Sequence, residues 1–259
     1  MRRYGARNNP DTFAPPCRGH SPRHGGGESV GVVPGTVPSQ CSRCAPGGTE
    51  GQIIRRGTTR DGLAEGAWTE WHANGALLSE SAFSGGLRTG PWKQWYPDGK
   101  FAADGAFSDD KREGPWIDWH PNGAVRSREM WRADRLDGAY ATCHENGARA
   151  VEGTYAAGKR QSTWTTWNSD GSPSSVGNYV DGNLNGPAQA WYKSGKLARE
   201  SAYADDKQHG AHRSWWENGT SHEQGRFEDG LRTGEWVVHR DDGTLDEQAS
   251  GKYERGVKL

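Results

Sequence analysis

The chain has 259 residues, of which 32% are hydrophobic, and its mean hydropathy of −0.99 is too low for the thick apolar core of a large globular domain. Its net charge of −1 argues against a general nucleic-acid-binding protein, which needs an excess of basic residues to contact phosphates. No run of 18 apolar residues occurs, so the sequence predicts no membrane-spanning helix.

Residues 1–50 are rich in Gly, Pro, Arg and Ser and show no period, which predicts a disordered arm. The start of the chain is basic but lacks an apolar core segment, so we do not identify it as a signal peptide. This favours a cytoplasmic protein, and export would follow if the true start lay upstream. Residues 1–60 carry nine Arg against three acidic residues, so the arm either lies against its own acidic domain or remains a solvated tail.

A group of metal-binding residue types occurs within the arm. They are Cys17, His20, Cys41 and Cys44, arranged as two short pairs. Three thiolates and an imidazole can bind zinc tetrahedrally, but the Gly- and Pro-rich segment between the pairs does not suggest a zinc knuckle. A disulfide bond, in an exported protein, and unpaired thiols are the alternatives. We therefore expect no metal and no cofactor as the simplest case.

From residue 51 the sequence repeats with a period of 24 residues. A half-unit at 51–65 precedes eight units that start at residues 66, 90, 114, 138, 162, 186, 210 and 234. Aromatic residues recur two, five and seventeen residues after each start, and we call these the first, second and third ring positions. Every unit also has a glycine nine residues after its start, preceded by Asn or Asp in all units but one.

Each unit predicts a β-hairpin. In the third unit, strands are expected at about 114–121 and 124–131, joined by an Asn-Gly turn of two residues that both take positive φ. A second turn, such as 228–234, leads to the next unit. Helix is not predicted, because no 3.6-residue apolar period occurs and glycine is too frequent. The expected fold is therefore all-β, an elongated single-layer antiparallel sheet of tandem hairpins at 51–259 preceded by a disordered N-terminal arm.

A two-residue turn also fixes the register of the hairpin. It places Trp92 opposite Gly105 and Trp116 opposite Glu129, so that large rings cover cross-strand glycines on one face. That face, which also receives Phe101, is the expected core. The second ring position has the opposite parity, so we expect it on the polar face beside Lys93.

The tryptophans of the second ring position are the predicted partner-binding residues. They are Trp71, Trp95, Trp119, Trp167, Trp191 and Trp215. A row of aromatic anchors on a polar face is typical of a protein-binding surface. The alternative is that these rings lie flat and cover their own backbone.

These units, of the form G-x-W-x-x-W-x-x-N-G with a later aromatic residue and a D-G turn, resemble MORN repeats, and most of all the variant units of the YwqK-type antitoxin group. The resemblance covers residues 51–259. It implies a twisted sheet of successive hairpins that acts as a scaffold, a protein-binding surface, a toxin-neutralising partner or a membrane-associated platform.

Catalytic chemistry is not predicted. His120 and His144 occupy equivalent places in adjacent units, roughly 9.5 Å apart, which is too far for both to bind one zinc ion. Cys143 and His144 are neighbours in a strand and should point to opposite faces, so Cys143 is expected to fill a ring position instead. We therefore expect a monomeric, non-enzymatic protein that binds a protein partner and no nucleic acid.

A peripheral membrane protein is the alternative function. Basic residues recur in the second turns, which all lie along one edge of the predicted sheet. They include Arg88, Lys111, Arg112, Arg135, Lys159, Arg160, Lys207 and Arg232. Aspartates stand beside most of them, so an anionic membrane would meet little net positive charge.

Overall fold

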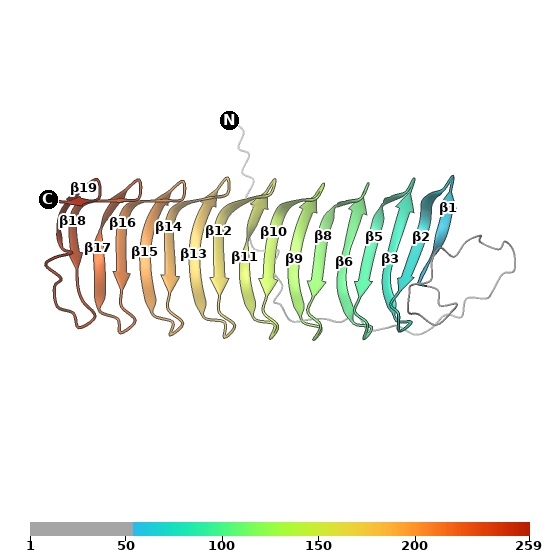
Figure 1. Cartoon of the computed structure of the whole chain (residues 1–259), viewed down its shortest axis with the longest axis horizontal. Coiled ribbons are helices and arrows are strands. Elements are labelled where there is room, and N and C mark those ends of the chain that lie inside the picture. Colours follow the sequence, from blue (N-terminus) through green and yellow to red (C-terminus); the bar gives the residue numbers. More distant parts are fainter. Residues whose placement is uncertain (1–53) are drawn as a thin grey trace, which may run out of the picture.

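The computed structural model describes residues 54–259, which form an elongated antiparallel sheet and contain no helix (Figure 1). The strands are β1 Arg55–Arg60, β2 Leu63–Trp71, β3 Leu77–Ser84, β4 Leu87–Arg88, β5 Gly90–Trp95, β6 Phe101–Ser108, β7 Lys111–Arg112, β8 Gly114–Trp119, β9 Val125–Arg132, β10 Arg135–Cys143, β11 Arg149–Ala156, β12 Lys159–Trp167, β13 Pro173–Val180, β14 Asn183–Trp191, β15 Leu197–Ala204, β16 Lys207–Trp215, β17 Ser221–Glu228, β18 Leu231–Val238, β19 Gly251–Glu254 and β20 Val257–Lys258. The prediction of an all-β sheet of tandem hairpins is confirmed. The predicted arm lies outside the described residues.

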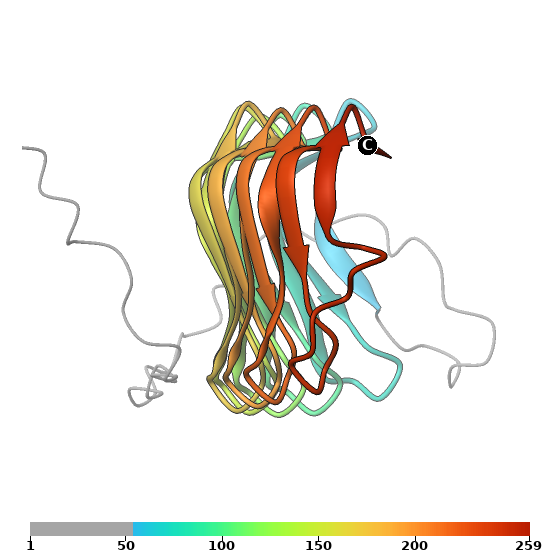
Figure 2. The same cartoon turned by 90° about the vertical axis from the view of Figure 1, so that its left-hand side faces the viewer.

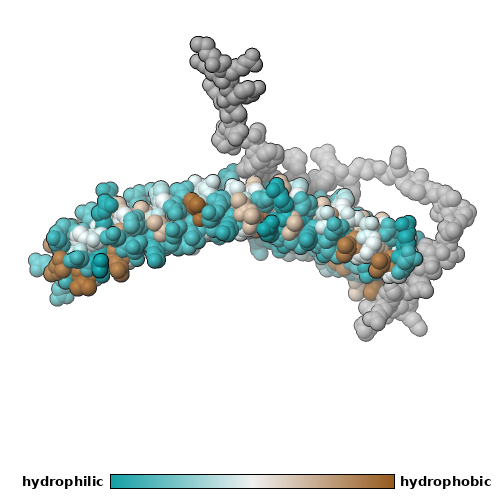
Figure 3. Space-filling view, turned by 90° about the horizontal axis from the view of Figure 1, so that it is seen from above, coloured by the Kyte–Doolittle hydropathy of each residue, from teal (hydrophilic) through white to brown (hydrophobic). Residues whose placement is uncertain are grey.

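The described chain is one layer thick. Figure 2 shows the hairpins superposed along the long axis, with the layer bent across its width. Figure 3 shows that the array is also arched along its length. Each long strand pairs with the strands before and after it in sequence, so no crossover connection is needed.

The two kinds of turn differ from the prediction. In the turn at Asp109–Asp110 both residues have positive φ, 50° and 64°, and Ser108 pairs with Lys111. This is the two-residue turn that suits a twisted hairpin. The Asn-Gly turns are longer loops of three residues: His72 N donates to Ala76 O at 2.8 Å, and only Gly75 has positive φ. The prediction of a two-residue Asn-Gly turn is therefore wrong.

A β-bulge nevertheless restores the predicted register. The three-residue loop shifts the pairing by one residue, so that Trp119 pairs with Val125. The bulge between Asp118 and Trp119 shifts it back. Beyond the bulge Trp116 pairs with Glu129, as predicted. The predicted pairs of Trp92 with Gly105 and of Trp164 with Gly177 are confirmed in the same way.

The residues of the first and third ring positions form the core, on one face that we call the ring face. Trp116 is 6% exposed and packs edge to face against Phe107 at 5.3 Å between centroids. Its ring covers Gly105 of the preceding hairpin, where a Cβ atom would lie 2.1 Å from Trp116 Cε3. The expectation that Trp92 covers Gly105 is therefore wrong. The ring leans away from its cross-strand partner and onto the hairpin before it, as the rings of Trp68 and Trp164 also do on Gly57 and Gly153.

Hydrogen bonds tie each hairpin to the next at both edges. At the Asn-Gly edge His72 Nε2 donates to Trp95 O at 2.9 Å, and Asn74 Nδ2 donates to Pro97 O at 3.0 Å. The equivalent bonds recur at His120, Asn122, His144, Asn146 and Asn218. At the other edge Arg88 N donates to Asp110 Oδ1 at 3.1 Å. Stability therefore depends on contacts between neighbouring repeats.

Candidate partner-binding surface

The second ring position lies on the face opposite the ring face, as its parity in the strand predicted. Trp71 lines a hollow together with Ala67 and Thr69, which alternate in β2 with Trp68 of the ring face. Trp95 contacts Phe101 at 5.4 Å, and Phe101 contacts Trp119 at 5.5 Å. The expectation that Phe101 lies on the ring face is therefore wrong, since its ring packs between these two indoles. The cause is the β-bulge, whose extra residue is Ala102 in β6. It reverses the side to which Phe101 points, whereas β5 alternates regularly from Trp92 to Trp95.

Trp95 and Trp119 stand on edge. The planes of Trp95 and Trp119 lie 31° and 35° from that of Phe101, and at these separations the rings overlap face to face along the axis of the sheet. They do not lie flat over their own backbone. The six tryptophans of the second ring position are half-buried, and we call them the Trp row.

The Trp row is interrupted once. In the fourth unit Cys143 occupies the second ring position, is 6% exposed and pairs with Arg149. Cys143 is buried in β10 and its neighbour His144 bonds to Trp167 O, so the two do not form a nucleophile and its base. The interruption divides the row into two stretches of three indoles. One stretch consists of Trp71, Trp95 and Trp119, and the other of Trp167, Trp191 and Trp215.

The indole N–H groups of the Trp row have no acceptor among the described residues, and none of the six nitrogens is buried without a partner. They are therefore open to solvent. In the first ring position the N–H groups are directed inward: Trp236 Nε1 donates to Arg226 O at 3.2 Å, and Trp164 Nε1 is buried and unbonded. The Trp row thus combines apolar ring edges with unused hydrogen-bond donors.

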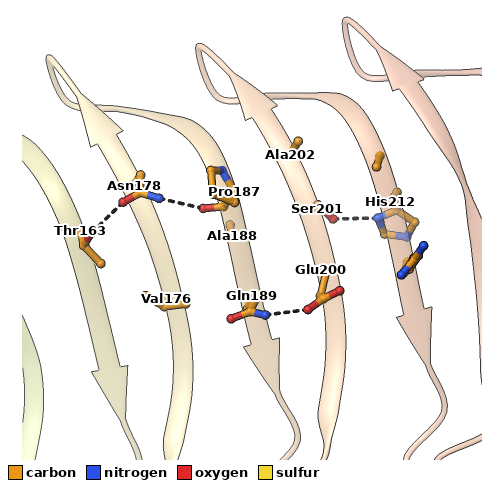
Figure 4. A pocket seen from close by; sticks show the side chains of 12 residues that line it. Thr163, Val176, Asn178, Pro187, Ala188, Gln189, Glu200, Ser201, Ala202 and His212 are labelled. Atoms are coloured by element: carbon orange, nitrogen blue, oxygen red, sulfur yellow. Dashed lines mark hydrogen bonds between the residues drawn. The ribbon is translucent and has the colours of Figure 1, made fainter.

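The face that carries the Trp row also has a hollow of about 510 Å³ over β12 to β16 (Figure 4). Pro187, Ala202 and Ala211 leave room there because their side chains are small. The polar groups are already bonded to each other, since Asn178 Nδ2 donates to Pro187 O and Gln189 Nε2 donates to Glu200 Oε1 at 2.6 Å. The hollow therefore offers fewer unused groups than the Trp row.

The histidines of the Asn-Gly edge have structural partners. His120 Nε2 donates to Cys143 O and His144 Nε2 donates to Trp167 O, each at 3.0 Å. Residues 54–259 contain no cluster of His, Cys, Asp and Glu that could bind a metal ion. Cys17, His20, Cys41 and Cys44 lie outside the described residues, so the zinc and disulfide predictions for them stay predictions.

A buried chain of hydrogen bonds in the C-terminal half was not predicted from the sequence. His212 Nδ1 lies 2.7 Å from Ser201 Oγ, and His212 Nε2 lies 3.1 Å from Glu223 Oε1. The hydrogen bond from His212 and the charge of Arg232 hold the pKa of the Glu223 carboxyl below its usual value. Ser201 and His212 are each 5% exposed beneath neighbouring side chains, which suits a structural link between strands better than a nucleophile. The sequence contained a signal for this chain, because His212 stands at a first ring position, where most units have a Trp or Tyr.

Two arginines of the second-turn edge, Arg88 and Arg112, are paired within the sheet. The Arg88 guanidinium packs over the Phe107 ring at 3.9 Å, and its Nε donates to Asp110 Oδ1 at 2.7 Å. Arg112 repeats this arrangement with Trp131 and Asp134. Figure 3 shows this edge as mostly hydrophilic, with hydrophobic residues near both ends. The pairing reduces the net attraction that an anionic membrane would exert.

The fold and the Trp row define a tandem β-hairpin repeat protein. Residues 184–205 match the family model described as MORN repeat variant. Repeats of this family generally bind proteins or membranes and are typically non-catalytic scaffolds. No curated protein matches the chain. Among the described residues, no helix is long and apolar enough to cross a membrane.

Proposed function

We propose that this protein is a non-enzymatic repeat scaffold that binds another protein through the Trp row. The observation that carries the proposal is the row of indoles, half-buried on one face, whose N–H groups have no acceptor among the described residues. In its narrower form, supported by the resemblance to YwqK-type units, the partner is a toxin that the array neutralises.

The chemistry of the row suits a protein partner. Tryptophan is enriched among the residues that dominate the affinity of protein interfaces, because a large ring and one N–H donor are fixed by few rotatable bonds. Here Phe101 also holds Trp95 and Trp119 in place, so little side-chain entropy is lost on binding. Repetition adds several weak contacts to one extended partner.

The test replaces two adjacent indoles and follows the recovery of a partner. Trp95→Ser with Trp119→Ser should abolish recovery of a protein that the unchanged chain captures. The matched control is Gln94→Ser with Arg126→Ser, because Gln94 follows Trp92 by two residues and Arg126 bonds to Asp118, which places both side chains on the ring face. Circular dichroism and melting should show that both variants stay folded.

The outcome also separates the two candidate kinds of partner. Undiminished recovery with the Trp variant would exclude the Trp row as the protein-binding surface. If the Trp variant instead kept every protein and lost only anionic vesicles, the membrane function would be favoured. We place the protein first because Asp110 and Asp134 bind the arginines that a membrane would need.

A further inference from the structure

The spacing of the Trp row restricts the kind of chain that can lie along it. Consecutive indoles within a stretch are one hairpin apart, which is two strands or about 9.6 Å. Aliphatic residues stand between them: Leu77 pairs with Trp71, Pro173 with Trp167, and Leu197 with Trp191. A ligand that uses all three rings of a stretch must present equivalent groups on one side about every 9.6 Å.

The hydrogen-bonding character of the row is a second restriction. The indole N–H is a donor only, so each ring asks for an acceptor from the ligand. No residue at a second ring position from Trp71 to Trp119 is charged, and the residues paired with them, Leu77, Phe101 and Val125, are apolar. The complementary ligand is therefore an uncharged segment that offers apolar groups and free carbonyl oxygens.

A polyproline II helix meets both restrictions. It rises about 3.1 Å per residue with three residues per turn, so one side repeats about every 9.3 Å, and its carbonyls have no internal partners. Over the two intervals of a stretch the mismatch with the sheet is only about 0.6 Å. An α-helix repeats about every 10.5 Å in seven residues, and its carbonyls are already bonded within the helix. An extended strand repeats one side about every 6.6 Å, which does not match.

We propose that each stretch of the Trp row binds a proline-rich segment of the partner, in the polyproline II conformation, with one proline in every three residues. The segment lies perpendicular to the strands. Its prolines lie over the residues that stand between successive indoles, Leu77 and Phe101 in one stretch and Pro173 and Leu197 in the other, and its carbonyls accept the indole N–H bonds. The proposal rests on the proposed function and names the ligand of the same surface.

The break at Cys143 and Arg149 sets the length of each bound segment. Three indoles span about 19 Å, which corresponds to about six residues of polyproline II helix. Arg149 is 47% exposed in its side chain and is paired with Glu152, so the break carries polar groups where the row is otherwise apolar. Two segments joined by a linker would bind both stretches with a gain from their linkage.

The experiment titrates the full chain with a synthetic peptide of about fifteen residues in which Pro-Ala-Leu is repeated. The control peptide has the same composition with irregularly spaced prolines. Binding is measured by calorimetry and by the indole N–H signals in ¹⁵N-correlated spectra. We expect the regular peptide to bind at least about tenfold more tightly and to shift the signals of the Trp row, because only its prolines match the spacing.

Two variants test the role of the donors. Trp95→Phe with Trp119→Phe keeps an aromatic ring at each position and removes the N–H groups, so the affinity should fall at least about fivefold. Trp216→Phe is the control, because its N–H is already bonded to His239 O at 3.0 Å and its loss should leave the affinity unchanged. Melting curves show whether each variant is folded. If a variant does not fold, the indole N–H signals of the unchanged chain still show whether the peptide binds at the Trp row.

Equal binding of the two peptides, or shifts confined to indoles outside the Trp row, would overturn the polyproline proposal. Absence of binding by the regular peptide would overturn it too. In that case the Trp95→Ser and Trp119→Ser variant still decides the proposed function, since loss of the captured protein would keep the Trp row as the interface and reject only this ligand class.

Discussion

Glycine at position 105 allows the Trp116 ring to lie on the backbone of the preceding hairpin, and Gly105→Ala should remove that contact. The new Cβ would lie 2.1 Å from Trp116 Cε3, so the ring must move. The backbone itself tolerates alanine, because φ of Gly105 is not positive. Overpacking costs about 1–3 kcal/mol, and full loss of a buried Trp costs about 3–5 kcal/mol. We expect a loss of about 3 kcal/mol in the free energy of unfolding.

A double-mutant cycle in urea isolates this contact. In the background of Trp116→Ala the clash is absent, so Gly105→Ala should be neutral or stabilise by about 0.5–1 kcal/mol through the lower backbone entropy of alanine. Gly177→Ala is the control, because the nearest atom is the flexible end of Leu184, 2.7 Å away. It should cost less than about 1 kcal/mol. If Gly105→Ala cost the same in both backgrounds, with an unchanged urea dependence, our account of the ring-on-glycine contact would be refuted.

Three further changes test other features. Ser162 has φ of 58° where the other units have glycine, so Ser162→Gly should raise the free energy of unfolding by about 1 kcal/mol, and a fall in the urea midpoint would contradict this. Leu184→Arg together with Ala188→Trp restores the Arg and Trp found in other units and should raise the free energy of unfolding by about 2 kcal/mol. An unchanged melting temperature would show that Leu184 already fills the space over Gly177. The pKa of the Glu223 carboxyl is lower in the folded state than in the unfolded chain. The ionised carboxylate therefore stabilises the fold fully at pH values above its unfolded pKa, and this stabilisation is lost as the pH falls through its folded pKa. Glu223→Gln should therefore weaken the acid dependence of the urea midpoint below about pH 4.5, and an unchanged acid slope would refute the link to His212.

The fold was predictable because a strict period and turn residues leave few alternatives. Twenty-four residues with two turns define one hairpin, and the register between Trp116 and Glu129 followed from the position of the Asn-Gly pair. That register was correct because two deviations cancel. The loop at Asn122 is one residue longer than predicted, and the bulge at Asp118 compensates for it beyond Trp119.

The face of Phe101 and Val125 was not predictable in the same way. Val125 lies between the longer loop and the bulge, so it shows their effect and lies on the face of Trp119 instead of the ring face. A β-bulge of this kind needs no special residue, and neither Asp118 nor Trp119 indicates it in the sequence. Pairing also does not say toward which neighbouring strand a ring leans, because that depends on packing. The chain of Ser201, His212 and Glu223 was predictable in part, since its members lie eleven residues apart and His212 replaces a ring.

The bonds between equivalent residues of neighbouring units, such as His72 to Trp95 O and Asn74 to Pro97 O, allow the protein to change length in whole steps. A gene that gained or lost one unit of 24 residues would join two surviving units through the same pair of bonds. Each such event would change the array by one hairpin, about 9.6 Å, without altering contacts elsewhere. The number of units would then act as a molecular ruler, which evolution could adjust by duplication and deletion to match the length of what the array binds.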